Sequence, residues 1–228
     1  MEISLLTTFF TRKKKKRIIA VFDLDGTLTT VRSVESAFFQ YLLVRRKLTI
    51  RNLLNSGGFY CRNILTNPLF AVKKNKMYLK GITTNKVALW AQEFIKENRD
   101  TLLHAKYLQL VKSHKDMGHT TILITGSPDI LVTHLLKSSW FDHVYAIELE
   151  TEDGIYTGRV SGNYYYGRAK KNLIICLTDE LDAELTRSYC YADSKSDIEM
   201  MSFFGHPVAV SPDSYLRRRA LKNNWEII

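Results

Sequence analysis

Four short apolar runs, each followed by polar residues, stand out along the chain: residues 17–22, 121–124, 189–192 and 207–210. The first run leads into Asp23, the second into Thr125 and the third into Asp193. Continuous apolar runs of this length are typical of buried parallel strands. Because ligands of such sheets bind beyond the carboxyl ends of the strands, these polar residues mark the expected site.

Apolar residues at helical spacing lie between and after these runs, over residues 130–137, 169–177 and 214–222. Strands that alternate with helices predict an α/β domain with a mostly parallel sheet. The acidic turn at residues 152–154, followed by residues 155–160, predicts a short hairpin.

Residues 31–115 have a different pattern. Apolar residues recur at helical spacing over residues 34–44 and 85–97, and no strand-like alternation stands out. We therefore expect a core made of residues 17–30 and 116–228, with residues 31–115 inserted as a helical cap after the first strand.

The net charge of +10 is unevenly distributed. Residues 30–115 hold sixteen basic and four acidic side chains, and residues 1–16 are predicted to be a basic flexible tail. These basic segments are either a solvated face or a surface that attracts an anionic substrate, a membrane or nucleic acid. No run reaches the ~18 apolar residues that a membrane span needs. The three cysteines have no metal-ligand spacing, which is typical of a reducing, cytoplasmic setting.

Carboxylates are the most informative polar groups. Asp23 and Asp25 stand two residues apart at the end of the first strand, and an ionised pair there is costly without a cation. Asp193 adds a third carboxylate from another strand end, and Asp197 a fourth one helical turn later. Oxygen ligands without a His or Cys cluster favour Mg²⁺ over Zn²⁺.

Groups suited to a phosphoryl oxygen follow the second strand. Thr125 offers a hydroxyl and Gly126 a backbone N–H, while Lys170 or the adjacent Lys171 offers a positive charge. A nucleophile, a metal, hydrogen-bond donors and a cation are the parts that phosphoryl transfer needs. The alternative for each is structural: Thr125 can cap a helix, and either lysine can be solvated.

These motifs, in order, resemble those of a known family. The apolar run with Asp23-x-Asp25-Gly-Thr, then Ile-Leu-Ile-Thr125-Gly, then Lys170, then Asp193-Ser-Lys-Ser-Asp197 is similar to the four motifs of the haloacid dehalogenase-like superfamily. The helical insertion resembles the cap of its phosphoserine-phosphatase-like branch. The resemblance covers residues 17–228 and implies a Rossmann-like three-layer α/β core.

The resemblance also implies roles for the carboxylates. Asp23 would be the nucleophile that forms an aspartyl-phosphate, and Asp25 would protonate the leaving oxygen and then activate water. Mg²⁺ would bind Asp23, the backbone carbonyl of Asp25, and Asp193. Superfamily dehalogenases lack an acid at the position of Asp25, so its presence favours a phosphatase. Asp197 would orient the lysine or support the metal ligands.

In the same way, Thr125, Gly126 and Lys170 would hold the phosphoryl group. One departure concerns the substrate, because Arg32 occupies the position of the cap-side acid that recognises the amine of phosphoserine. A guanidinium repels an ammonium and attracts a carboxylate or second phosphate. The sequence thus predicts a Mg²⁺-dependent phosphatase for a small anionic phosphate monoester other than phosphoserine. A phosphotransferase, or a silent membrane- or nucleic-acid-binding protein, is the alternative, and the oligomeric state is not predicted.

Overall fold

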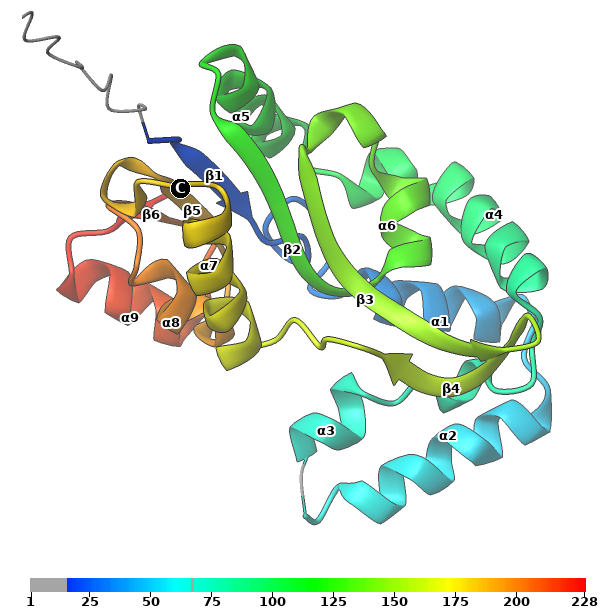
Figure 1. Cartoon of the computed structure of the whole chain (residues 1–228). Helices are drawn as coiled ribbons and strands as arrows, with labels where there is room; N and C mark the ends of the chain where they lie inside the picture. Colours follow the sequence, from blue (N-terminus) through cyan, green and yellow to red (C-terminus); the bar gives the residue numbers. More distant parts are fainter. Residues whose placement is uncertain (1–15, 67) are drawn as a thin grey trace, which may run out of the picture.

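The computed structural model describes residues 16–66 and 68–228 (Figure 1). The tail expected for residues 1–16 therefore lies, apart from Lys16, outside the described residues. Among the described residues, no helix is both long and apolar enough to cross a bilayer.

Within the described part of the chain, seven strands form one sheet in the order β4-β3-β2-β1-β5-β6-β7. The strands are β1 (Ile19–Phe22), β2 (Thr120–Pro128), β3 (His143–Glu152), β4 (Ile155–Ser161), β5 (Tyr189–Ala192), β6 (His206–Ala209) and β7 (Glu226–Ile227). All neighbouring pairs are parallel except β3 and β4, which form an antiparallel hairpin. The predicted α/β class with a mostly parallel sheet is confirmed.

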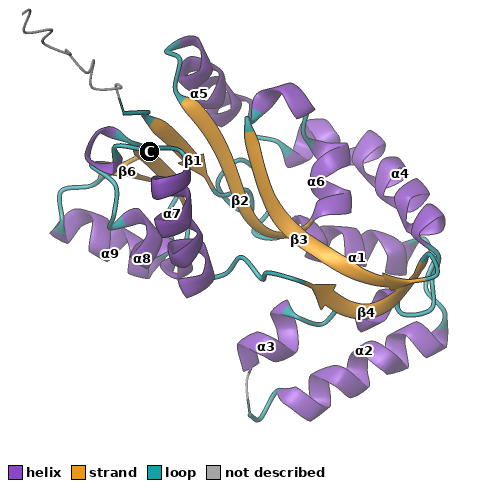
Figure 2. Cartoon of the chain, viewed as in Figure 1, coloured by secondary structure: helices purple, strands orange, loops and turns teal. Residues whose placement is uncertain are grey.

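Helices cover both faces of this sheet (Figure 2). The α-helices are α1 (Val34–Val44), α2 (Ile50–Asn63), α3 (Pro68–Lys73), α4 (Thr84–Leu102), α5 (Ala105–Asp116), α6 (Asp129–Leu135), α7 (Arg168–Glu180), α8 (Ile198–Met201) and α9 (Ser214–Lys222). The 3-10 turns are η1 (Met77–Leu79), η2 (Ser138–Trp140), η3 (Leu185–Arg187) and η4 (Lys195–Asp197). Helices α1, α4, α5 and α6 pack on one face, and α7, α8 and α9 on the other.

Strand β1 explains the three layers. Its side chains alternate, so that Ala20 and Phe22 belong to the core beneath α1, α4, α5 and α6, while Ile19 and Val21 belong to the core beneath α7, α8 and α9. All four are fully buried. A strand buried on both faces has no need of polar residues until it ends, which is why the apolar run stops at Asp23.

The inserted segment contains α2, α3 and η1, which lie beside the β3–β4 hairpin (Figure 1). Backbone hydrogen bonds join the two parts, because Gly81 N–H donates to Tyr156 O and Tyr156 N–H donates to Ile82 O, each over 2.9 Å. A third bond runs from Thr84 N–H to Gly154 O. The otherwise open edge of β4 is covered in this way.

Helix α5, which the sequence analysis placed in the cap, packs on the sheet. Its His114 Nε2 lies 2.8 Å from the hydroxyl of Tyr191 on β5, and its ring packs edge-on against Phe22 of β1. Helices α1 and α4 also contribute to the core on this face, so α2 and α3 are the helices of our proposed cap that extend beyond it.

The order in which strands are added to the sheet changes side at β1. Strands β2, β3 and β4 extend the sheet on one side of β1, whereas β5, β6 and β7 extend it on the other. Adjacent strands whose connections leave in opposite directions open a crevice at their carboxyl ends. In this fold the crevice lies between β1 and β5, directly beyond Phe22 and Ala192.

Candidate active site

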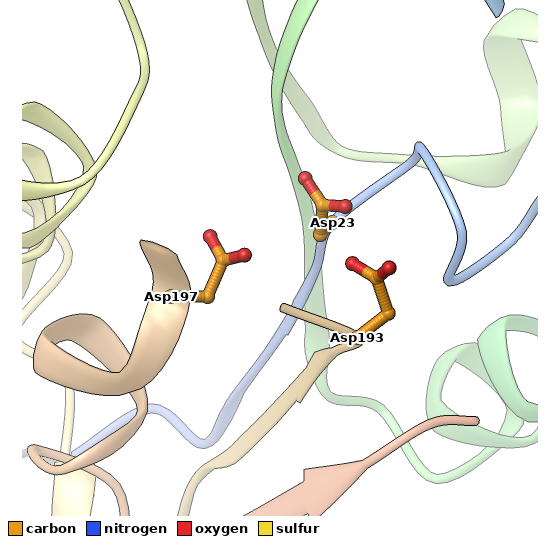
Figure 3. Close-up of side chains that lie close together, drawn as sticks. All are labelled: Asp23, Asp193 and Asp197. Carbon is orange, nitrogen blue, oxygen red and sulfur yellow. The ribbon is translucent and has the colours of Figure 1, made fainter. Parts of the chain in front are cut away.

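Three carboxylates gather at this crevice (Figure 3). Asp23 follows β1, Asp193 follows β5, and Asp197 ends the η4 turn after β5. One oxygen from each lies within 4.8 Å of the others. Backbone bonds fix the strand ends, since Asp23 N–H donates to Tyr191 O over 2.9 Å.

The turn after Asp23 brings Asp25 and Asp193 into the same crevice. Gly26 has φ +77°, a left-handed conformation that glycine adopts at little cost. A Cβ atom there would lie 2.3 Å from Asp193 Oδ2, so no other residue fits without moving this carboxylate. The turn is closed by the N–H groups of Thr27, Leu28 and Thr29, which all donate to the carbonyl of Leu24.

Lys170, on the first turn of α7, contacts two of the carboxylates. Its buried Nζ donates to Asp23 Oδ1 and lies 2.8 Å from Asp197 Oδ1. Lys171, the alternative that the sequence left open, points elsewhere, with its Nζ 3.7 Å from Glu199 and its side chain 35% exposed. Ser194 Oγ donates to the other oxygen of Asp197 over 2.7 Å.

Asp25 is oriented by two donors. The N–H of Val34, at the start of α1, donates to Oδ1, and the hydroxyl of Ser127 donates to Oδ2, each over 2.7 Å. Burial raises the pKa of Asp25, and these two hydrogen bonds offset part of that rise. A carboxyl group with a raised pKa is suited to carry a proton to a leaving group.

The three residues after β2's apolar run have distinct positions. Gly126 and Ser127 line the cavity, whereas Thr125 is fully buried and its Oγ1 accepts the N–H of Ser127 over 3.0 Å. Ser127 does not cap α6, which begins at Asp129 with Pro128 at its N-cap, and the Ser127 hydroxyl donates to Asp25.

Sequence reasoning did not assign a role to Asp213. Its Oδ1 caps α9 by accepting the N–H groups of Tyr215 and Leu216, while its Oδ2 accepts the N–H of Lys195 over 2.7 Å. Its own N–H donates to Asp193 O. Asp213 therefore ties the loop that carries Asp193 to α9. The Ser-Pro-Asp sequence before α9 predicts the cap, but not the bond to residue 195.

The carboxylates lie at the base of a cavity of about 240 Å³. The remaining wall includes two cations, Arg32 and Lys73, and three consecutive tyrosines, residues 164–166. Glu35 also lines the cavity, but its carboxylate accepts hydrogen bonds from the buried Nζ of Lys76 and, over 3.2 Å, from the hydroxyl of Tyr78. The mouth of the cavity therefore presents positive charge.

The acidic cluster lacks enough positive charge of its own. Burial raises the pKa of Asp23 to about 8, against the lowering effect of Lys170. Burial and the neighbouring Asp197 raise the pKa of Asp193 to about 7. Ionised carboxylates at such positions need a further cation, and three convergent oxygen donors fit Mg²⁺. Asp23 and Asp193 would hold it from opposite sides of the crevice.

Comparison with known proteins agrees with this geometry. A family model described as haloacid dehalogenase-like hydrolase matches residues 20–202. The chain belongs to this family. This hydrolase is 28% identical over 216 residues to phosphoserine phosphatase SerB1 of Mycobacterium tuberculosis, covering 91% of the chain and 69% of the relative. It is 25% identical over 217 residues to histidinol-phosphatase of Neisseria meningitidis, covering 92% and 97%.

Among solved structures, this hydrolase is similar to a phospho-aspartyl intermediate analogue of phosphoserine phosphatase. The TM-score is 0.62 at 19% identity, and the match covers 93% of each chain. This likeness confirms the expected fold. The family match and the phosphatases among the relatives show that the chain is an enzyme, a phosphatase of the haloacid dehalogenase-like family.

Proposed function

We propose that the enzyme hydrolyses a phosphate monoester in two steps, through a phosphorylated Asp23. The observation that supports this most directly is the meeting of Asp23, Asp25, Lys170 and Asp193 in one small cavity. Lys170 contacts Oδ1 of Asp23, which leaves Oδ2 as the attacking atom. The family's usual cofactor, Mg²⁺, would neutralise charge on the phosphate when bound between Asp23 and Asp193.

In the first step, Oδ2 of Asp23 forms a bond to phosphorus while the bond from phosphorus to the substrate oxygen breaks. Asp25 gives its proton to that leaving oxygen. In the second step, a water molecule attacks phosphorus, Asp25 takes the proton of the water, and the bond to Asp23 breaks to release phosphate. Lys170 and the N–H of Gly126 hold the phosphoryl oxygens, while Thr125, which the sequence predicted as a third such group, is buried behind them and supports the turn through its hydrogen bond with Ser127.

The cavity wall supports a substrate with a second negative charge. Arg32 and Lys73 face the same space, and the only carboxylate among the described cap-side lining residues, Glu35, is already neutralised by Lys76 and Tyr78. An ammonium group would therefore meet cations without a free carboxylate to bind. Phosphoserine and histidinol phosphate both carry an ammonium, so we expect both to be poor substrates.

The test is a substrate panel with the purified protein and Mg²⁺, comparing phosphoserine with phosphates that carry a carboxylate or a second phosphate. Asp23→Asn is the blank, and Asp100→Asn, on the exposed side of α4, is the matched control. We expect turnover to be abolished only by the first change. Mass spectrometry after acid quenching should find phosphate on Asp23. A preference for phosphoserine would refute the predicted substrate class. Full activity of Asp23→Asn would refute the role of Asp23 as the nucleophile.

Transfer to an acceptor other than water would use the same first step. Product analysis with added alcohols or nucleosides distinguishes the two reactions, because transfer yields a new phosphate ester and hydrolysis yields inorganic phosphate.

A further inference from the structure

Exposed apolar side chains are concentrated at one place in the molecule. Among the described residues, four large apolar side chains are more than two thirds exposed: Val44 (80%), Ile50 (73%), Leu54 (68%) and Leu65 (92%). All four lie between the end of α1 and the residues just after α2. Single exposed apolar residues need no explanation, but a group confined to one helix and its flanks does.

Helix α2 carries its apolar side chains outward. Ile50, Leu54 and Cys61 are exposed and, at 100° per residue, fall on the same face. The opposite face carries the half-buried Phe59 and the buried Asn52, whose Nδ2 donates to Lys80 O over 3.0 Å. One turn further along, the carbonyl of Ser56 accepts a hydrogen bond from Asn75 Nδ2 over 3.0 Å. Hydrogen bonds thus attach this side of the helix to the molecule, and the helix lies at the outer edge of the fold (Figure 1).

The surroundings of this face are positively charged. Residues 36–92 contain ten Lys or Arg residues and no Asp or Glu. Arg51 and Arg62 on α2 are both exposed. A groove of about 970 Å³ runs beside α2 and is lined by Arg51, Lys80 and Lys86, with acidic residues 152 and 153 on its hairpin side. The groove meets α2 at Asn52 and Asn55, on the side away from Ile50 and Leu54, so the headgroup contacts beside the apolar face fall to the exposed arginines.

We propose that the apolar face of α2 docks on an anionic phospholipid bilayer, with Ile50 and Leu54 in the interfacial region and the flanking arginines at the headgroups. An exposed apolar helix face beside basic residues is the pattern of interfacial membrane binding. A symmetric contact between two copies through this face would bring Arg51 and Arg62 of one copy close to the arginines of the other, which is unfavourable. A nucleic acid would leave the apolar side chains in water. The docking does not depend on the proposed phosphatase chemistry.

The first test measures flotation of the full chain with vesicles of phosphatidylcholine and phosphatidylglycerol, against phosphatidylcholine alone. We expect binding to the anionic vesicles only. Leu54→Glu should lower the partition coefficient by roughly tenfold or more, because it removes an apolar contact and adds a charge that the surface repels. Leu221→Glu, on α9 and 63% exposed in the parent, is the matched control and should bind like the parent.

A second test reports the site of contact. An environment-sensitive fluorophore on Cys61 of a Cys176→Ser variant should shift to the blue with anionic vesicles, while the same label on Cys176 of a Cys61→Ser variant should not. Hydrolysis of p-nitrophenyl phosphate should be equal in Leu54→Glu and the parent.

Three results would overturn the docking surface. The first is equal binding of Leu54→Glu and the parent to the anionic vesicles. Vesicle binding that is lost only when the basic residues 12–17 are neutralised belongs to the same result. The second is a dimer in analytical ultracentrifugation that Leu54→Glu dissolves, without vesicle binding. The third is binding of the parent to DNA in place of vesicles.

Discussion

A Cβ atom on Gly26 would lie 2.3 Å from Oδ2 of Asp193, so the first motif and the fourth are in direct steric contact. The absence of a side chain at Gly26 is what allows the two strand ends to share one crevice.

Gly26→Ala should therefore lower activity far more than stability alone explains. The left-handed conformation costs a residue with a side chain about 1–2 kcal/mol, and the methyl group must also displace Asp193. We expect a fall in kcat/KM of roughly 100-fold, the usual effect of a misplacement of about 1 Å. Gly118→Ala is the control, since Gly118 has φ +74° but open space around it. Equal activity of the two variants would contradict the steric argument.

Lys170→Met should destabilise the protein by about 3–5 kcal/mol, because it leaves Asp23 and Asp197 buried without their cation. Urea unfolding without Mg²⁺ measures the change. Lys171→Met, which removes a partly exposed lysine, should cost under about 1 kcal/mol. The double variant Lys170→Met with Asp197→Asn should recover part of the loss. No recovery would show that the ion pair is not the cause.

Without metal, the acidic cluster should destabilise the protein as the pH rises. The pKa of Asp23 changes from 3.8 in the unfolded chain to about 8 in the folded chain, so the folded state binds more protons between these values. Stability from this group is therefore present at low pH and is lost as the pH rises toward 8. Thermal unfolding in EDTA at several pH values measures this slope.

Mg²⁺ should reverse that loss, because it binds the ionised carboxylates and releases protons. At a concentration a hundredfold above its Kd, the expected gain is about 2.7 kcal/mol. Asp193→Asn should remove most of the gain, and an unchanged unfolding temperature with Mg²⁺ at pH 8 would argue against a metal site here.

His114 should contribute instability on the acid side. Burial, together with His119 nearby, lowers the pKa of His114 from 6.5 to about 4. The unfolded chain binds a proton below pH 6.5 that the folded chain does not, so stability falls as the pH drops from 6.5 toward 4. NMR titration of the imidazole and the unfolding of His114→Asn across this range are the measurements. Parallel curves for parent and variant would exclude this contribution.

Arg32→Glu should change substrate choice. For a phosphate with a second negative charge we expect kcat/KM to fall roughly tenfold, because a charge contact at ~4 Å near a protein surface is worth on the order of 1–4 kcal/mol. For phosphoserine it should rise. Lys96→Glu, an exposed change on α4 away from the cavity, is the control. Equal changes of kcat/KM in both variants would indicate an effect of the overall charge of the protein, and not a contact between Arg32 and the substrate.

Strand ends were the part of the fold most readable from the sequence. Continuous apolar runs identify strands buried on both faces, and the rule that sites lie at their carboxyl ends placed Asp23, Thr125 and Asp193 together before any coordinates. The boundaries of the helices at 34–44 and 214–222 also agree with the structure, since a serine and an aspartate cap them.

Long-range contacts could not be read in this way. The neutralisation of Glu35 by Lys76 joins residues 41 positions apart, and neither residue has a local pattern that indicates the other. The acidic turn at residues 152–154 predicted the β3–β4 hairpin, but the start of β3 at His143 could not be read, because exposed and half-exposed positions break its alternation. The bond from the Ser127 hydroxyl to Asp25 joins residues 102 positions apart, and it depends on how β1 and β2 pair.

The backbone pairing of residues 81–84 with β4 has a mechanical consequence. Any swing of the inserted helices as a rigid body must either break the bonds between Gly81, Ile82 and Tyr156 or carry the tip of the hairpin along. The inserted segment next to β4 and the hairpin are therefore expected to move as one mechanical unit, so a change of shape at one is transmitted to the other.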